Sequence, residues 1–428
     1  MTVAKSHSHE RTILVGLERD GVTRWDVEDS LTELRQLAAT AGAQVVETIV
    51  QRLDKPTAPF YIGKGKAEEV RQHCREQGVT SVIFDDELSP AQGRNLEGLT
   101  HRKVLDRTQL ILDIFAQRAR SREGRLQIEL AQLQYLLPRL TGMWSHLSRQ
   151  SGGIGTRGPG ETQLEVDRRR VQERIARLER DLREVRKHRT VQREGRLRRN
   201  WPVASLVGYT NAGKSSLLNR LTNAGVLSAD KLFATLDPTT RQLVLPNRQK
   251  VLLTDTVGFI RKLPHTVIES FKATLEEIQL ADLLIHVVDL SHPDYHEQMH
   301  AVEATVAELG AEQKQTMIVF NKIDAIPDPE IVRSQLHRFP GSVAISARTG
   351  EGMATFFEEL ELRLSAWRMR VEFRIPIVES ALLAEMHRVG HVLSTTYEDD
   401  IAVVVAHIPP EMKSRLALYE TVPDTVRA

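Results

Sequence analysis

Short apolar runs alternate with amphipathic helical stretches in the first part of the chain. The runs TILVGL, AQVVETIV and SVIFDD are rich in β-branched residues, whereas DVEDSLTELRQLAATAG and KAEEVRQHCREQG repeat apolar residues at helical spacing. This alternation is typical of βαβ units, in which helices cover a parallel sheet. It predicts an N-terminal α/β domain over residues 1–114.

After this domain the pattern changes to leucines at alternating spacings of four and three. Such a seam is typical of a helix that packs along one face. A glycine-rich break separates two stretches of this kind, so we expect two helices that fold back as an antiparallel hairpin over residues 115–200. The seams consist of Leu126, Leu130, Leu133, Leu137, Leu140, Trp144 and Leu147, and of Leu164, Val171, Ile175, Leu178, Leu182 and Val185.

The break between the two expected helices reads SGGIGTRGPGETQ over residues 151–163. Its GIGTRG string matches GxGxxG, but a dinucleotide fingerprint follows a strand and opens the helix of a βαβ unit, which this context lacks. A first helix rising about 1.5 Å per residue would carry the break roughly 30 Å from the body. The break is either an inert turn or a probe whose backbone and Arg157 enter a groove of nucleic acid, and we favour the probe.

From Trp201 onward, six apolar runs alternate with helical stretches: VASLV, QLVLP, KVLLTD, LLIHVVD, TMIVFN and SVAIS. They predict a doubly wound, mostly parallel sheet over residues 201–367. Residues 368–428 show a β-α-β-β order, typical of a small α+β domain. The expected fold class is therefore α/β: an N-terminal α/β domain, a helical hairpin, a doubly wound domain and a small C-terminal domain.

The composition predicts where the protein is located and what class of partner it binds. The single cysteine, Cys74, excludes an internal disulfide, and no stretch reaches the ~18 apolar residues that span a bilayer. The polar start has no apolar leader, so we expect a cytoplasmic protein without stable membrane insertion. Residues 115–200 carry 21 Lys and Arg against 10 Asp and Glu, and residues 201–365 carry 15 against 20. The basic segment indicates a polyanionic partner such as nucleic acid, or else only a solvated helix face.

A complete GxxxxGKS phosphate loop stands between the run VASLV and the helical SSLLNRL. In such a loop, backbone N–H groups surround the β-phosphate, the lysine reaches the β- and γ-phosphate oxygens, and the serine hydroxyl ligates Mg²⁺. We therefore expect Lys214 to take part in catalysis and Ser215 to bind the metal. The loop consists of Gly208, Tyr209, Thr210, Asn211, Ala212, Gly213, Lys214 and Ser215.

Three further motifs follow the ends of later apolar runs. Asp255-Thr256-Val257-Gly258 supplies a carboxylate that can hold Mg²⁺ through water and a glycine N–H that can sense the γ-phosphate. Asn321-Lys322-Ile323-Asp324 ends in a carboxylate that can accept hydrogen bonds from guanine N1–H and N2–H₂; adenine offers neither, so GTP should be preferred over ATP by at least about tenfold. Ser346-Ala347-Arg348 would present a backbone N–H to guanine O6. Together the four motifs indicate a GTPase that binds GTP or GDP and Mg²⁺.

The segment FATLDPTT, residues 233–240, lies between the first two motifs. A switch segment supplies one threonine hydroxyl to Mg²⁺ while the γ-phosphate is present and releases it after hydrolysis. Spacing alone leaves three candidates: Thr235, Thr239 and Thr240.

The strings GYTNAGKSSLLN, FATLDPTT, DTVGFI and NKID, with YIGKGKAEEV, FDDELSPAQ, RLQIELAQLQYLLPRL and GGIGTRGPGETQLEVDRRR, resemble the HflX family of translation-factor-related GTPases. The resemblance runs from about Tyr61 to Ala347. It implies that Thr235 is the Mg²⁺ threonine, and that it acts in catalysis with Lys214 and Gly258. By the same resemblance, the nucleotide-binding switch residues are Phe233, Ala234, Thr235, Leu236 and Asp237.

The resemblance also implies a partner and a cellular role. It implies binding to the large ribosomal subunit, with the hairpin directed toward ribosomal RNA near the peptidyl-transferase region. It further implies that the protein splits stalled or stress-damaged ribosomes into subunits, in translation under stress or in ribosome biogenesis. We expect the protein itself to be a monomer.

Phe259 departs from a common GTPase pattern. Many regulatory GTPases have a glutamine after the DxxG glycine to orient the attacking water, and a phenyl ring cannot make that hydrogen bond. Slow hydrolysis by the protein alone and acceleration by a partner such as the ribosome are therefore expected. Phe259 can equally serve as a core residue of the switch.

Two other functions fit parts of the sequence. The protein could be a signalling or scaffold switch that binds another protein, with the basic hairpin merely solvated. The N-terminal domain could bind a nucleotide of its own, such as ATP, although it contains no phosphate loop.

Overall fold

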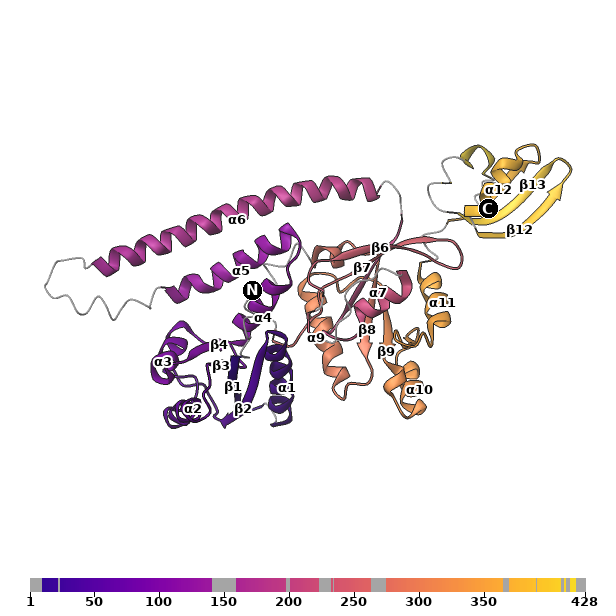
Figure 1. Cartoon of the computed structure of the whole chain (residues 1–428). Coiled ribbons are helices and arrows are strands. Elements are labelled where there is room, and N and C mark those ends of the chain that lie inside the picture. The colour runs from indigo at the N-terminus through magenta and orange to yellow at the C-terminus, as the bar shows by residue number, and fades with distance from the viewer. Residues whose placement is uncertain are drawn as a thin grey trace, which may run out of the picture. The chain divides into compact units, whose positions relative to one another are not determined.

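A computed structural model of the chain describes residues 10–21, 24–140, 159–197, 201–222, 232–233, 235–262, 275–364, 369–389, 391–408, 412 and 416–420. The chain divides into two compact units, coloured along the sequence in Figure 1. The first unit comprises Met1–Arg186, Ala229–Asp237 and Ile260–Ala273, and the second comprises Lys187–Ser228, Pro238–Phe259 and Thr274–Ala428. The expected limits at residues 114, 200 and 367 stay a prediction.

The first unit contains a four-stranded parallel sheet in the order β2-β1-β3-β4. Its strands are β1 (Glu10–Glu18), β2 (Ala43–Arg52), β3 (Ser81–Phe84) and β4 (Lys103–Asp106). Its helices are α1 (Arg24–Thr40), α2 (Lys64–Glu76), α3 (Pro90–Thr100) and α4 (Arg107–Arg118). This confirms the predicted βαβ pattern. Strand β4 was not predicted, because its apolar run is only Val104 and Leu105 between charged residues.

Local sequence signals explain where two of these helices begin. Ser89 caps α3 in a capping box with Gln92, and a proline occupies the first turn. Asp106 caps α4 by accepting a hydrogen bond from the backbone N–H of Gln109 at 3.0 Å. The same Asp106 carboxylate accepts hydrogen bonds from the Tyr135 hydroxyl at 2.6 Å and from Arg139 at 3.1 Å. It therefore ties the next helix of the chain to the edge of the sheet.

That next helix is α5 (Arg122–Leu140), which pairs with α6 (Pro159–Leu197) in a helical hairpin, seen side by side in Figure 1. The predicted seam packs between them: Leu130, Leu178 and Leu182 are buried, with Leu126, Leu133 and Ile175 against them. Arg174 on α6 donates two hydrogen bonds to Glu129 on α5, at 2.7 and 2.9 Å. Trp144, Leu147 and most of the glycine-rich break lie outside the described residues.

The second unit is built on a six-stranded sheet in the order β10-β9-β8-β5-β7-β6. The strands are parallel except β6, which pairs antiparallel with β7. They are β5 (Val203–Gly208), β6 (Thr239–Val244), β7 (Lys250–Asp255), β8 (Leu283–Asp289), β9 (Thr316–Asn321) and β10 (Val343–Ala344). The helices are α7 (Lys214–Thr222), α9 (Tyr295–Glu308), α10 (Pro329–Arg338) and α11 (Met353–Arg363). The predicted doubly wound sheet is confirmed.

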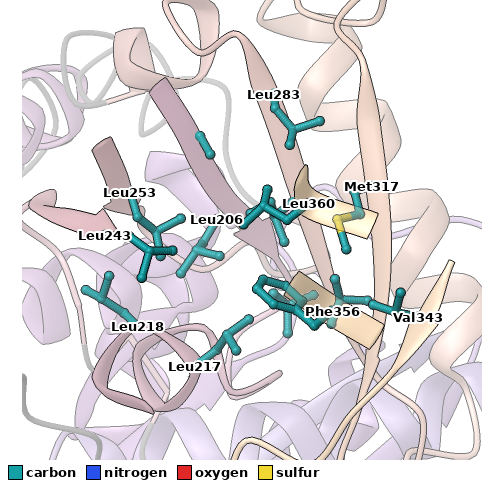
Figure 2. Packing of buried hydrophobic residues seen from close by; sticks show 14 of the residues in the cluster. Leu206, Leu217, Leu218, Leu243, Leu253, Leu283, Met317, Val343, Phe356 and Leu360 are labelled. Atoms are coloured by element: carbon teal, nitrogen blue, oxygen red, sulfur yellow. The ribbon is translucent and has the colours of Figure 1, made fainter. Parts of the chain in front are cut away.

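One face of this sheet packs against α7 and α11. Figure 2 shows Leu217 and Leu218 from α7 and Phe356 and Leu360 from α11 converging on strand residues such as Leu206. Each fully buried side chain of this kind contributes about 1.5–3 kcal/mol. The cluster thereby fixes α7, the helix that opens at the phosphate loop, against the sheet.

The end of the chain forms the expected β-α-β-β domain. Its antiparallel sheet has the order β11-β13-β12, with strands β11 (Met369–Pro376), β12 (His391–Glu398) and β13 (Ile401–Ile408). Met386 of α12 (Ser380–Val389) is buried in a core with Phe373 and Val404. Among the helices of the described residues, none has both the length and the apolar composition needed to cross a bilayer.

Candidate functional site

The phosphate loop joins the end of β5 to the start of α7 and depends on two glycines. Gly213 has φ +96°, and a Cβ there would lie 2.2 Å from Asn321 Nδ2. Gly208 has φ +151°, and a Cβ there would lie 2.3 Å from the carbonyl oxygen of Val287. A side chain at either position would collide with a residue near the end of a strand, Asn321 of β9 or Val287 of β8. The glycine spacing of the motif is therefore required by close packing at the carboxyl ends of the strands.

The Lys214 side chain packs against the backbone of this loop and is almost completely buried. Its ammonium group donates hydrogen bonds to the carbonyl oxygens of Gly208, at 2.9 Å, and Tyr209, at 2.7 Å. Burial lowers the pKa of Lys214 to about 8, and the charge of Asp255 acts in the opposite direction. An anion bound in the loop would favour the charged form of this lysine. The arrangement therefore suits the binding of phosphate groups.

A hydroxyl and a carboxylate meet at the start of α7. Ser215 Oγ donates a hydrogen bond to Asp255 Oδ2 at 2.7 Å, and Asp255 itself is completely buried at the end of β7. Mg²⁺ prefers hard oxygen ligands such as carboxylates, hydroxyls, waters and phosphates. The pair Ser215 and Asp255 fits the metal predicted from the sequence.

Backbone hydrogen bonds join the phosphate loop to the segment after β7. Phe259 N–H donates to the carbonyl of Gly208 at 3.1 Å, and Thr210 N–H donates to the carbonyl of Phe259 at 2.7 Å. A Cβ on Gly258 would lie 2.9 Å from Thr210 Cα, so only glycine fits there. Phe259 is 1% exposed and thus belongs to the core of this joint. The remaining motif residues, Thr256 and Val257, are also buried.

Asn321 connects the phosphate loop to the loop that contains Ser346, Ala347 and Arg348. Its amide nitrogen donates to the carbonyl of Ala212 at 2.8 Å, and its amide oxygen accepts from the N–H of Ala347 at 3.0 Å. Asn321 therefore holds together two loops that the sequence predicts to bind the nucleotide.

The predicted guanine-binding carboxylate, Asp324, follows Ile323 in the short helix η1 (Ile323–Ala325). Ser346 Oγ donates to it at 2.6 Å, and Arg348 forms an ion pair with its other oxygen at 2.5 Å. The hydrogen bond from Ser346, and after it the charge of Arg348, holds the pKa of Asp324 below its usual value. The group is therefore an ionised acceptor. Lys322 forms an ion pair with Asp289 at 2.6 Å.

The predicted switch residues lie in the first unit, apart from Ala234, which is outside the described residues. Leu236 is buried, and the Phe233 ring meets that of Phe115 edge to face at 4.6 Å. Asp237 accepts hydrogen bonds from the backbone N–H groups of Arg120, at 2.9 Å, and Ser121, at 2.8 Å. The switch is thus attached to the start of α5, a contact that the sequence did not reveal.

The approach of Asp237 to α5 depends on a glycine in the first turn of that helix. A Cβ on Gly124 would lie 2.6 Å from Asp237 Oδ1. The Ser121 hydroxyl also donates to Asp237 and accepts from the Gly124 N–H at 2.9 Å.

The three candidate magnesium-binding threonines do not all lie in the same secondary structure. Thr239 and Thr240 lie in β6, within the antiparallel ladder with β7, and the Thr240 hydroxyl is 3.0 Å from that of Thr254. Thr235 lies outside any strand, in the segment that belongs to the first unit. Its position is that of a loop threonine, and its role as a magnesium ligand stays a prediction.

A buried ionic cluster holds the segment after Phe259, and sequence reasoning missed it. The Arg107 guanidinium, 2% exposed, pairs with Asp85 at 2.9 Å and donates to the carbonyl of Arg261 at 3.1 Å. Lys262 pairs with Asp86 at 3.0 Å and also with Asp85. These residues are far apart in the sequence, so no spacing pattern could have grouped them.

Family models match three successive parts of the chain. Residues 28–116 match "GTP-binding GTPase N-terminal", residues 118–196 match "GTP-binding GTPase Middle Region", and residues 203–322 match "50S ribosome-binding GTPase".

Similar proteins include the GTPase HflX of Lacrimispora saccharolytica, 49% identical over 95% of this chain and 96% of that protein. The GTPase HflX of Escherichia coli K12 is 45% identical over 88% of this chain and 89% of its own length. Among solved structures, a GTP-binding protein from the archaeon Sulfolobus solfataricus in complex with GDP is 24% identical, with a TM-score of 0.44, over 83% of this chain and 99% of that one.

Proposed function

This chain belongs to the HflX family of GTPases, and from that premise we propose that it binds the large ribosomal subunit and separates stalled or stress-damaged ribosomes into subunits. It binds guanine nucleotide and hydrolyses GTP, as the family and its GTPase domain entail. The observation that carries the ribosomal proposal is the match of residues 203–322 to the "50S ribosome-binding GTPase" family, in a sequence where a basic hairpin precedes these residues. We place this activity in the cytoplasm and attribute it to a monomer.

Charge and shape of the hairpin support an RNA partner. Residues 115–200 carry 21 Lys and Arg against 10 Asp and Glu. Arg168, Arg169, Arg177 and Arg183 on α6 are exposed. Exposed arginines along a helix bind phosphate groups through charge and through paired donors. We therefore assign the hairpin to ribosomal RNA and its glycine-rich tip to a crowded groove.

The nucleotide site would act through positions already described. Mg²⁺, when bound by Ser215, by Thr235 and through water by Asp255, would neutralise charge on the β- and γ-phosphates. Lys214 would hold the β- and γ-phosphate oxygens, and the Gly258 N–H would donate to the γ-phosphate. Asp324 would select guanine.

The switch contacts of the first unit suggest how nucleotide state reaches the hairpin. Asp237, two residues after Thr235, holds the backbone that begins α5, and Lys262, four residues after Gly258, contacts Asp85 and Asp86. GTP would order the segment that contains Thr235 and Asp237 and the segment that contains Gly258 and Lys262. Their contacts would then fix α5 in one position, and hydrolysis of GTP would release α5. On this proposal, the GTP form binds the ribosome tightly and the GDP form leaves.

Sedimentation of intact ribosomes tests this function. With GTP or a non-hydrolysable analogue, the protein should convert whole ribosomes into subunits and migrate with the large subunit, whereas with GDP it should do neither. Binding should weaken steeply between about 50 and 200 mM salt, because phosphate contacts release counterions. Whole ribosomes that stay intact with every nucleotide would contradict the proposal. Salt-insensitive binding to a protein instead would favour a signalling switch.

Deletion of residues 152–160 provides a matched variant in the same experiment. GTP affinity should stay unchanged, because the phosphate loop and the loops that carry Asp324 and Ser346 lie in the second unit, while splitting should be lost. Normal splitting by this variant would refute the role of the tip and leave the GTPase assignment intact.

Phe259 leads to a kinetic prediction. Because its buried ring offers no hydrogen bond to water, the isolated protein should hydrolyse GTP slowly, and saturating large subunits should raise kcat by at least about tenfold. Phosphate release at several subunit concentrations measures this effect. Equal turnover with and without subunits would show that the ribosome does not stimulate the site.

A further inference from the structure

Thr210, the third residue of the phosphate loop, has a buried hydroxyl without a partner. The residue is 6% exposed, and among the described residues nothing forms a hydrogen bond with its Oγ1. Two buried threonines nearby differ: Thr256 donates to the carbonyl of Leu206 at 2.6 Å, and Thr254 pairs with Thr240. A buried hydroxyl without a partner is unfavourable unless a ligand or water completes it.

The position of Thr210 indicates which ligand could form a hydrogen bond with its hydroxyl. Thr210 Cγ2 and Lys214 Nζ each lie 3.0 Å from the point that a Cβ on Gly258 would occupy. The hydroxyl branches from the same carbon as Cγ2, so it lies next to that methyl group. In a phosphate-loop site, the lysine and the N–H of the DxxG glycine contact the γ-phosphate; here these groups are Lys214 and the Gly258 N–H. The Thr210 side chain therefore lies beside Gly258 and Lys214, the groups that would contact the γ-phosphate.

The backbone around Thr210 is fixed by the segment that carries Phe259. Thr210 N–H donates to the Phe259 carbonyl at 2.7 Å, and Tyr209 forms a parallel bridge with Phe259. The Phe259 ring is buried and cannot orient water, whereas a hydroxyl can both donate and accept a hydrogen bond. Phe259 has no polar side-chain group, but Thr210, whose backbone is hydrogen-bonded to that of Phe259, carries a hydroxyl.

We propose that the Thr210 hydroxyl is a catalytic group of GTP hydrolysis: it accepts a hydrogen bond from the attacking water and donates one to a γ-phosphate oxygen. The water oxygen forms a bond to the γ-phosphorus while the bond to the bridging oxygen breaks, and GDP leaves with that electron pair. The proton of the water passes to the released phosphate. Thr210 keeps its own proton and only positions the water. This inference rests on the assignment of the nucleotide site.

The test compares Thr210→Val, which keeps the shape and removes the hydroxyl, with Thr210→Ser, which keeps the hydroxyl. Single-turnover hydrolysis by Thr210→Val should fall by at least about tenfold, while its GDP affinity stays within about threefold of that of the unaltered chain. Thr210→Ser should hydrolyse GTP within about threefold of the unaltered rate. Thr305→Val removes a buried hydroxyl bonded within α9, remote from the motifs, and should leave hydrolysis unchanged.

Two results would overturn the proposal. One is hydrolysis by Thr210→Val at close to the unaltered rate. The other is a loss of GDP affinity parallel to the loss of rate, which would show that the side chain only shapes the loop. Thr210→Ala repeats the measurement if the valine does not fit, and the same two results decide it. GDP binding by the unaltered chain separately tests the assignment of the site, so the two failures are distinguishable.

Discussion

Lys214→Ala is expected to lose GTP and GDP affinity by at least about a hundredfold. The ammonium group would make charge-assisted hydrogen bonds to phosphate oxygens, each worth about 1.5–3 kcal/mol, and about 1.4 kcal/mol corresponds to a factor of ten. The variant also loses the buried contacts to the carbonyls of Gly208 and Tyr209, which help to shape the loop. Titration calorimetry with GDP measures the effect directly.

Lys250→Ala is the matched control, because Lys250 lies in the same unit and is exposed on β7, next to the Trp201 ring. It removes the same charge and should leave GDP affinity unchanged. Circular dichroism of both variants checks that the fold is retained. If Lys214→Ala bound and hydrolysed GTP normally, the assignment of this phosphate loop would be wrong.

Asp324→Asn is expected to reverse the base preference of the site. The carboxylate would accept from two donors of guanine, whereas an asparagine amide would place its own N–H₂ against guanine N2–H₂. GTP affinity should fall by at least about a hundredfold, since two hydrogen bonds to a charged group are lost. Xanthosine triphosphate carries a carbonyl in place of that amino group, so it should bind the variant more tightly than GTP does. Competition against a fluorescent nucleotide compares the two affinities.

Asp328→Asn serves as the control in this experiment. Asp328 lies four residues further on and caps α10 by accepting from the N–H of Glu330 at 2.9 Å. Asparagine caps helices about as well as aspartate, so both stability and base preference should be retained. An unchanged preference for GTP in Asp324→Asn would mean that another group selects the base.

Much of this architecture follows from local sequence patterns. The alternation of apolar runs and helical stretches predicted the four-stranded and six-stranded sheets, because strands buried on two faces and their covering helices have periodicities that differ along the chain. The glycines and the lysine of the phosphate loop were recognisable because the spacing from Gly208 to Ser215 encodes a backbone shape. The leucine seam predicted the hairpin, although its second half alternates less regularly. Strand β4 was missed because its apolar run is only Val104 and Leu105, between charged residues.

The contacts between distant segments could only be found in the folded structure. Spacing along the sequence left Thr235, Thr239 and Thr240 as equal candidates, and the resemblance favoured Thr235; the pairing of β6 with β7, which places Thr239 and Thr240 in a strand, appears only in the folded structure. It gave no reason to connect Arg107 with Lys262, or Asp237 with Gly124.

The chain alone therefore determined the type of nucleotide and the class of fold, because those depend on short motifs and local periodicity. The attachment of the switch segments and the solitary hydroxyl of Thr210 were decided by the tertiary structure. Burial, hydrogen-bond partners and ion pairs arise when remote residues are brought within a few ångströms, and no spacing along a sequence specifies that distance.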